Sequence, residues 1–263
     1  MAFLPKTFRT LCYYCLIFAV IYGSLLVLGP HRRASLAKSY SAVLGFYISI
    51  TAFSLLLLLA MEGRNVIRLL GIRKEGLLES FLLSSGIIAI MNLMAIIYAM
   101  ISMNVGLGAI LERARTLAET YRGAYWFEGM PSSLLPLAAL VMWTAIGILY
   151  FSLIQAYGIE KLGKKGILVA IMVSALLYNA PLVTGQWKVD DLLILCILFP
   201  VIYWITGNSL GLVASYVIMF ELPVLAAFAR AGYYSFLFML LTRAAIGLAS
   251  LVYLPYILRR LKG

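Results

Sequence analysis

Eight apolar runs, separated by short polar or basic gaps, account for most of the 263-residue chain. A membrane-spanning α-helix needs roughly 20 apolar residues to cross a hydrocarbon layer of ~30 Å. The pattern therefore predicts an all-α fold, a polytopic transmembrane helix bundle with about eight spans, in which residues 1–263 form a single integral membrane domain. The expected spans are Leu11–Leu28, Ser41–Met61, Leu77–Ile101, Leu134–Tyr157, Ile167–Thr184, Leu192–Thr206, Ser209–Ala229 and Tyr234–Leu258.

The stretch Val105–Tyr121 has a different pattern. Its apolar side chains recur at helical spacing, and Arg and Glu residues take the opposite side, which predicts an amphipathic helix. Such a helix can lie in the plane of the membrane interface. It can equally pack on the protein itself as a loop helix, and the pattern fits both interpretations.

Composition and charge agree with a membrane protein. Hydrophobic residues make up 64% of the chain and charged residues only 12%, about half the charged share of an ordinary soluble domain. The formal net charge of +11 does not indicate nucleic-acid binding, because the cations lie in short gaps between apolar runs and form no solvated basic face. With eight spans, twelve Lys and Arg residues fall on the side of both termini and eight on the other. This difference favours a cell-membrane protein with cytoplasmic N- and C-termini.

Ionisable residues inside apolar runs are costly in lipid and therefore informative. Glu221 lies in the seventh run and Arg243 in the eighth, and we expect them to pair across two helices. The pair could be purely structural, or it could line a polar cavity or contact a substrate. Asn92 and Asn179 are further polar residues of the spans, where interhelical hydrogen bonding is the usual role.

No metal or cofactor site is expected. His31 is the only histidine and lies beside Arg32 and Arg33, so it cannot supply a site that needs several histidines. Cys12 and Cys15 have CxxC spacing within an apolar run, without a second pair or a nearby histidine. Burial as small packing residues is therefore the expected role of the cysteines.

Four short motifs carry a resemblance to a known family. They are Leu70-Gly71-Ile72-Arg73 before the third run, Gly163-Lys164-Lys165-Gly166 after the fourth, Ser174-Ala175-Leu176-Leu177-Tyr178 in the fifth, and Thr206-Gly207-Asn208-Ser209-Leu210 at the start of the seventh. In these motifs, residues 66–221 resemble the CAAX protease and bacteriocin-processing (CPBP, or Abi) intramembrane proteases. The resemblance implies a helical membrane fold in which paired glutamates activate a water molecule and histidines stabilise the developing oxyanion.

The residues that carry catalysis in that family are replaced in this chain. The two glutamate positions fall on Tyr150 and Phe151, and the arginine position falls on Gln155. The histidine positions fall on Leu182 and on Tyr216, or on its neighbour Val217 in the alternative register. An unperturbed Tyr has a pKa of about 10, so it cannot replace a carboxylate base at neutral pH. The resemblance therefore implies a pseudoprotease that is not an enzyme.

Three functions are compatible with these observations. The first is a catalytically inactive CPBP-like membrane protein that acts as a scaffold or partner-binding subunit, in contact with membrane lipids and a protein partner but not with nucleic acid. The second is a small permease subunit of a membrane transporter, whose basic loop after the fourth run would contact an ATPase. The third is an active peptidase that uses Glu221 as a relocated base.

Overall fold

The structure is a computed structural model, and it describes residues 5–38, 40–112, 116, 133–178, 192–221 and 233–262. All regular elements within these ranges are helices, which confirms the expected all-α class. The longer α-helices are α1 (Lys6–Lys38), α2 (Tyr40–Glu62), α4 (Leu77–Met103), α6 (Leu135–Gly147), α8 (Lys164–Tyr178) and α13 (Tyr233–Lys262). The shorter ones are α3 (Val66–Leu69), α7 (Tyr157–Leu162), α10 (Phe199–Thr206) and α11 (Ser209–Ser215). A 3₁₀ turn, η1 (Gly63–Asn65), and three π-helical segments, η2 (Ile148–Ala156), η3 (Leu192–Leu198) and η4 (Tyr216–Glu221), complete the list.

Five helices in the described ranges are long and apolar enough to cross a membrane, as expected of an integral membrane protein. The number of eight spans is not confirmed, because the described helices of the other three expected spans are shorter. Helix α8 has 15 residues, and the remaining two are the short apolar helices Leu193–Thr206 and Ser209–Met219. The five long candidates are Lys6–Ser24, Leu44–Leu69, Leu77–Met103, Pro136–Leu162 and Leu240–Arg259.

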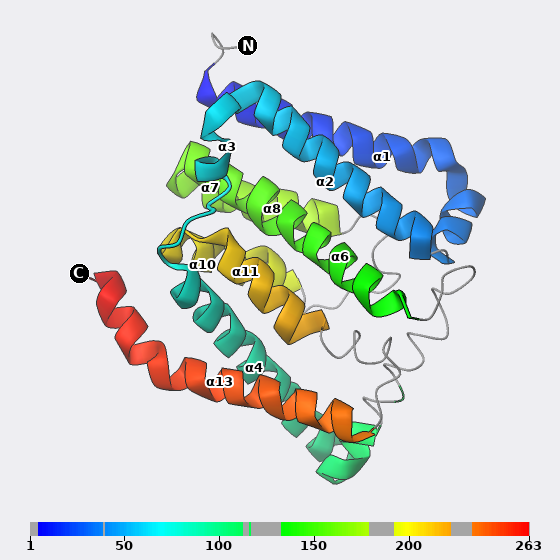
Figure 1. Cartoon of the computed structure of the whole chain (residues 1–263), viewed down its shortest axis with the longest axis vertical. Coiled ribbons are helices and arrows are strands. Elements are labelled where there is room, and N and C mark those ends of the chain that lie inside the picture. Colours follow the sequence, from blue (N-terminus) through cyan, green and yellow to red (C-terminus); the bar gives the residue numbers. More distant parts are fainter. Residues whose placement is uncertain are drawn as a thin grey trace.

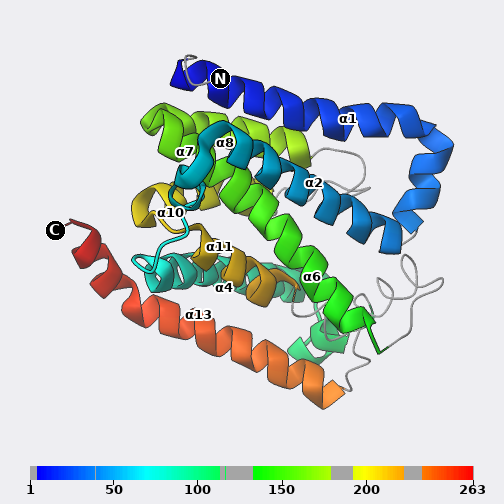
Figure 2. The ribbon, with the colours of Figure 1, turned by 45° about the horizontal axis from the view of Figure 1, so that its top comes forward.

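The order of the helices in space differs from their order in the chain (Figures 1 and 2). Helices α1 and α2 pack together on one side, and α2 contacts α6. The other side is formed by α13, which packs on α4, and α4 in turn packs on α11. The third long helix of the sequence therefore lies between two helices that follow it by more than 100 residues.

The centre of the bundle is the continuous helical stretch Pro136–Leu162. Within its apolar 18-residue core segment 61% of the residues are buried, compared with 17% in the corresponding segment of Leu240–Arg259 at the periphery. Every residue from Leu149 to Ile159 is buried. A helix that is apolar on all sides is suited to such a central place, because each of its faces can contact another helix.

Small residues bring α13 close to α4. A Cβ atom added to Gly247 would collide with the Cβ of Ala89, and one added to Gly86 would lie 3.0 Å from the Cβ of Ser250. Because lipid competes equally well for apolar side chains, close approach at small residues is a common basis of helix association in membranes.

Several boundaries differ from the expectation. The first run was expected to end at Gly29-Pro30, but α1 continues to Lys38. Of the expected amphipathic helix Val105–Tyr121, the structure describes only residues 105–112 and 116, and residues 107–112 are helical. Pro200 lies at the start of α10, directly after η3, where its missing N–H and its ring prevent an undisturbed α-helix.

Candidate functional site

Two of the motifs that are far apart in the sequence form a hydrogen-bonded junction at one end of the bundle. We define the motif junction as Leu70–Gly76, which connects α3 to α4, together with Thr206–Ser209, which connects α10 to α11. The Asn208 side chain donates through Nδ2 to the carbonyl oxygen of Arg73, and also to that of Glu75 at 3.1 Å. The Ser209 backbone N–H donates to the Gly71 carbonyl at 3.1 Å, and its hydroxyl donates to the Leu70 carbonyl at 2.5 Å.

The junction requires glycine at two of its positions. Gly71 and Gly76 have φ angles of 65° and 71°, in the left-handed region that side chains with a Cβ avoid. A Cβ atom on Gly71 would lie 2.5 Å from the Tyr203 ring, and one on Gly76 would collide with the carbonyl oxygen of Thr206. The two glycines of the connection Leu70–Gly76 thus permit its close contact with Tyr203 and Thr206.

An ion pair connects the junction to α7. Arg73 Nη2 lies 2.7 Å from Glu160 Oε1, and the Tyr203 hydroxyl donates to the same oxygen at 2.9 Å. The two charged side chains are 35% and 22% exposed, so water screens part of their attraction. These contacts hold the Arg73 side chain near Gly207. They link the connection Leu70–Gly76 to both α7 and α10.

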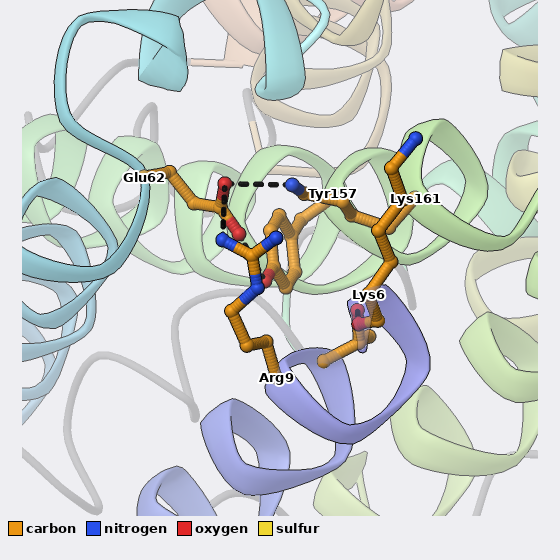
Figure 3. A network of polar contacts seen from close by, with 6 residues as sticks. Lys6, Arg9, Glu62, Tyr157 and Lys161 are labelled. Atoms are coloured by element: carbon orange, nitrogen blue, oxygen red, sulfur yellow. Dashed lines mark hydrogen bonds and ion pairs between the residues drawn. The ribbon is translucent and has the colours of Figure 1, made fainter. Parts of the chain in front are cut away.

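A second carboxylate, that of Glu62 at the end of α2, holds a more buried cluster of polar side chains (Figure 3). Lys161 Nζ lies 2.6 Å from Glu62 Oε2, and Arg9 Nη1 lies 4.0 Å from it. The Tyr157 hydroxyl donates to Glu62 Oε1 at 3.2 Å. The side chains of Glu62 and Lys161 are only 5% and 10% exposed, so loss of either would leave a buried charge uncompensated.

The Gly163–Gly166 motif forms the tight turn between α7 and α8. Gly163 has a φ of 61°, and a Cβ on Gly166 would collide with the backbone of Gly158 on the preceding helix. The two helices therefore touch backbone to backbone at this end of the bundle. This contact fixes α7, which carries Glu160 and Lys161 to the two ion pairs.

Aromatic rings fill the place to which the resemblance assigns catalytic residues. Phe151, at a glutamate position, is 1% exposed, and Tyr216, at a histidine position, is 5% exposed. Their ring centroids are 5.4 Å apart in an edge-to-face arrangement, and the Phe199 ring lies 4.9 Å from that of Phe151. Tyr150 is buried in the same segment. The structure thus brings Phe151 and Tyr216 together, and it places them in close apolar packing.

Gln155, at the arginine position, takes part in a buried polar network. Its Nε2 donates to the Ser174 hydroxyl at 3.0 Å and to the carbonyl of Leu195 at 2.8 Å. One turn earlier, the Ser152 hydroxyl donates to that of Ser209 at 2.9 Å. This bond connects the central helix to the motif junction. Gln155 therefore joins three helical segments, η2, α8 and η3.

The described positions to which the resemblance assigns catalytic residues lie in or beside π-helical segments. Tyr150, Phe151 and Gln155 lie in η2, Leu195 lies in η3, and Tyr216 begins η4. A π-helical turn leaves backbone groups without their usual α-helical partners, and such turns occur often at functional sites. The Leu195 carbonyl, which accepts from Gln155, is one backbone group that a side chain satisfies here.

The expected intramembrane polar site lies only partly within the described residues. Asn179 and Leu182 lie outside them, as does the side chain of Glu221. Arg243 is half-buried on α13, and Asn92 is exposed on α4. The pairing of Glu221 with Arg243 stays a prediction, which exchanging the two charges would test: the exchange should restore folding that each single reversal impairs.

The described part of the chain contains no group of three or more His, Cys, Asp or Glu side chains that could hold a metal ion. Cys196 is buried as expected, but Cys12 is half-buried and Cys15 is exposed. For Cys15 the expectation of burial is therefore wrong. A cysteine at helical spacing can equally face outward, and the sequence alone does not distinguish the two faces of an apolar helix.

The Glu62 and Glu160 clusters are the polar features that the sequence analysis missed. A usable signal existed: each glutamate ends or follows an apolar run, and Lys161 is adjacent to Glu160. Comparison with known proteins adds no relative, because the sequence matches no family model and no curated protein or solved structure.

Proposed function

We propose that this chain is a catalytically inactive, CPBP-protease-like integral membrane protein that acts as a scaffold or partner-binding subunit. The observation that carries the proposal is the packing of Phe151 against Phe199 and Tyr216. Aromatic rings there occupy the positions of a glutamate and a histidine in the family that the sequence resembles. The phenyl ring of Phe151 cannot accept a proton from water, so it cannot replace the glutamate that activates the water molecule in that family.

The motif junction supports the same proposal from the structural side. Its glycines, Asn208 and Ser209 are engaged in direct contacts between α4, α10 and α11. The residues that hold the helices together are thus in place, whereas the residues expected to carry chemistry are replaced. This combination fits a protein that uses its fold to bind rather than to cleave.

The proposal includes eight membrane crossings with both termini in the cytoplasm of a cell. The five long helices would be joined by α8, Leu193–Thr206 and Ser209–Met219. An even number of crossings agrees with the position of the start of α1 and the end of α13 at the same end of the bundle (Figures 1 and 2). The larger number of Lys and Arg residues at this end favours its cytoplasmic placement.

Site-specific photo-crosslinking would test the binding role. A photoreactive amino acid is introduced singly at Tyr98 on α4 and Val252 on α13, which are 73% and 76% exposed, and at Leu56 on α2, which is 65% exposed. A scaffold should crosslink one and the same protein in high yield from at least one of these positions and not from all of them. Crosslinks to lipid alone from all three positions would contradict the proposal, and an ATPase as the crosslinked protein would favour the permease function.

A peptidase assay complements this experiment. The purified full chain, reconstituted in lipid, is incubated with hydrophobic and prenylated peptides, and Glu221→Gln serves as the matched variant. We expect no cleavage above that of a protein-free control. Cleavage that disappears in Glu221→Gln would replace the proposal by the peptidase function.

A further inference from the structure

The connection between α2 and α4 exposes both cations and large apolar side chains. Ile67 is 64% exposed and Leu78 is 60% exposed. Exposed cations alternate with them along the same segment. We call this surface the basic-apolar rim and define it by the exposed residues Arg64, Ile67, Arg68, Ile72, Lys74, Leu77 and Leu78.

The cations of the rim have no acidic partner among the described residues. The nearby carboxylates are already engaged, Glu62 with Lys161 and Arg9, and Glu160 with Arg73. Arg64, Arg68 and Lys74 form no ion pair with another described residue. Only Glu75 adds an exposed negative charge within the segment. The rim therefore carries an excess of positive charge that ion pairs with the described residues do not neutralise.

The rim lies where a membrane-spanning helix would leave the hydrocarbon. It joins the candidate spans Leu44–Leu69 and Leu77–Met103. Helix α2 (Tyr40–Glu62) has 23 residues, which at 1.5 Å per residue makes it about 35 Å long and longer than a hydrocarbon thickness of ~30 Å. The chain then turns at Gly63, which has a φ of 60°, so η1 and α3, which carry Arg64 and Arg68, would lie at the level of the lipid headgroups.

The backbone beneath the rim is fixed. Bonds from Asn208 and Ser209 hold the carbonyl groups of residues 70, 71, 73 and 75, and Gly71 and Gly76 are in direct contact with Tyr203 and Thr206. A surface on a fixed backbone loses little conformational entropy when it binds a ligand.

We propose that the basic-apolar rim binds the headgroups of anionic phospholipids in the leaflet at this end of the bundle. The guanidinium groups of Arg64 and Arg68 match phosphate oxygens, which Arg binds through paired N–H donors. The ammonium group of Lys74 adds charge, and Ile67, Ile72 and Leu78 extend into the upper acyl region. The rim does not depend on whether the chain is a scaffold, so this inference stands apart from the proposed function.

Native mass spectrometry of the full chain in mild detergent tests the proposal. The protein is mixed with equal amounts of phosphatidylglycerol and phosphatidylcholine that carry the same acyl chains, and the retained lipids are counted. We expect preferential retention of phosphatidylglycerol. Each cation removed from the rim, as Arg64→Gln, Arg68→Gln or Lys74→Gln, should lower the ratio of the two lipids by about fivefold, since a cation near an anionic surface is worth about 1 kcal/mol.

A control variant separates the rim from net charge. Arg32→Gln combined with Arg33→Gln and Lys38→Gln removes three cations from the other end of α1, and it should leave the ratio within about twofold of wild type. An equal fall in this control and in the rim variant that combines Arg64→Gln, Arg68→Gln and Lys74→Gln overturns the proposal, because net charge then explains the binding. Equal retention of both lipids by the wild-type protein also overturns it, as does binding of an acidic protein to the rim without lipid preference. Unchanged circular dichroism and thermal unfolding in the rim variants exclude misfolding as the cause.

Discussion

Asn208 holds the motif junction through both ends of its amide, and a set of substitutions separates the two contributions. Its Oδ1 accepts from the Gly211 backbone N–H at 3.0 Å, as the N-cap of α11. Its Nδ2 donates to the carbonyl groups of Arg73 and Glu75. Asn208→Ala removes both, which costs about 1 kcal/mol for the cap and about 1–3 kcal/mol for a buried carbonyl left without a donor. We expect a total loss of about 2–4 kcal/mol.

Asn208→Asp is the decisive member of the set, because Asp is as good an N-cap as Asn. It keeps the acceptor for Gly211 but turns a carboxylate oxygen toward the carbonyl oxygens of Arg73 and Glu75. If the donor bonds matter as the structure indicates, this variant is at least as unstable as Asn208→Ala. Asn208→Ser, which keeps the cap and removes the opposing oxygen, should lie between wild type and alanine.

Thermal unfolding of the purified full chain in one detergent measures the differences. A loss of 2–4 kcal/mol corresponds to about 5–15 °C in Tm for a protein of this size. Limited trypsin digestion adds a local readout, since Arg68, Arg73 and Lys74 are possible cleavage sites in the connection. A stability of Asn208→Asp equal to that of wild type would refute the role assigned to the donor bonds.

Three further substitutions probe other contacts. Gly76→Ala should destabilise the chain by about 2–4 kcal/mol through its positive φ and its clash. Gly45→Ala, in open space inside α2, should instead stabilise it by up to about 1 kcal/mol in the same unfolding assay, because Ala favours a helix interior over Gly; equal effects of the two substitutions would contradict the close contact. Glu62→Gln should lower the free energy of unfolding by about 3–5 kcal/mol, because it leaves a buried cation without its partner. Adding Lys161→Met should recover part of that loss in a double-mutant cycle. Strictly additive effects of the two substitutions would argue against the pair. Phe151→Ala should lower the free energy of unfolding by about 3–5 kcal/mol because of the cavity it leaves. If thermal unfolding shows a smaller loss of stability than a Leu→Ala substitution at an exposed site, the aromatic packing contributes little.

The sequence predicted the helices better than their arrangement. Helix α4 begins at Leu77 as expected, and α11 begins at Ser209, because Gly76 and Asn208 are strong boundary signals before apolar runs. The position of α4 between α11 and α13 could not be predicted, since apolar helix faces carry little information about their neighbours. Small residues such as Gly247 indicate a close contact but do not name its partner.

The candidate site was predicted in its parts but not as a whole. The motifs around Gly71 and Asn208 were recognised separately, and only the structure shows that they are hydrogen-bonded to each other. The Glu62 cluster was missed because Arg9, Glu62 and Lys161 come from three distant runs. Periodicity describes the faces of one helix, whereas an ion pair between helices depends on their tertiary packing.

The π-helical segment η2 has a consequence for how the central helix can change in length. Because a wide turn holds one residue more than an α-helical turn, deleting one residue from Ile148–Ala156 would return it to α-helix while α6 and α7 keep their orientations. The same deletion within α7 would rotate the residues after it by about 100°, which would turn Lys161 away from Glu62. A one-residue deletion in η2 should therefore preserve the contact of Lys161 with Glu62, whereas the same deletion in α7 should break it.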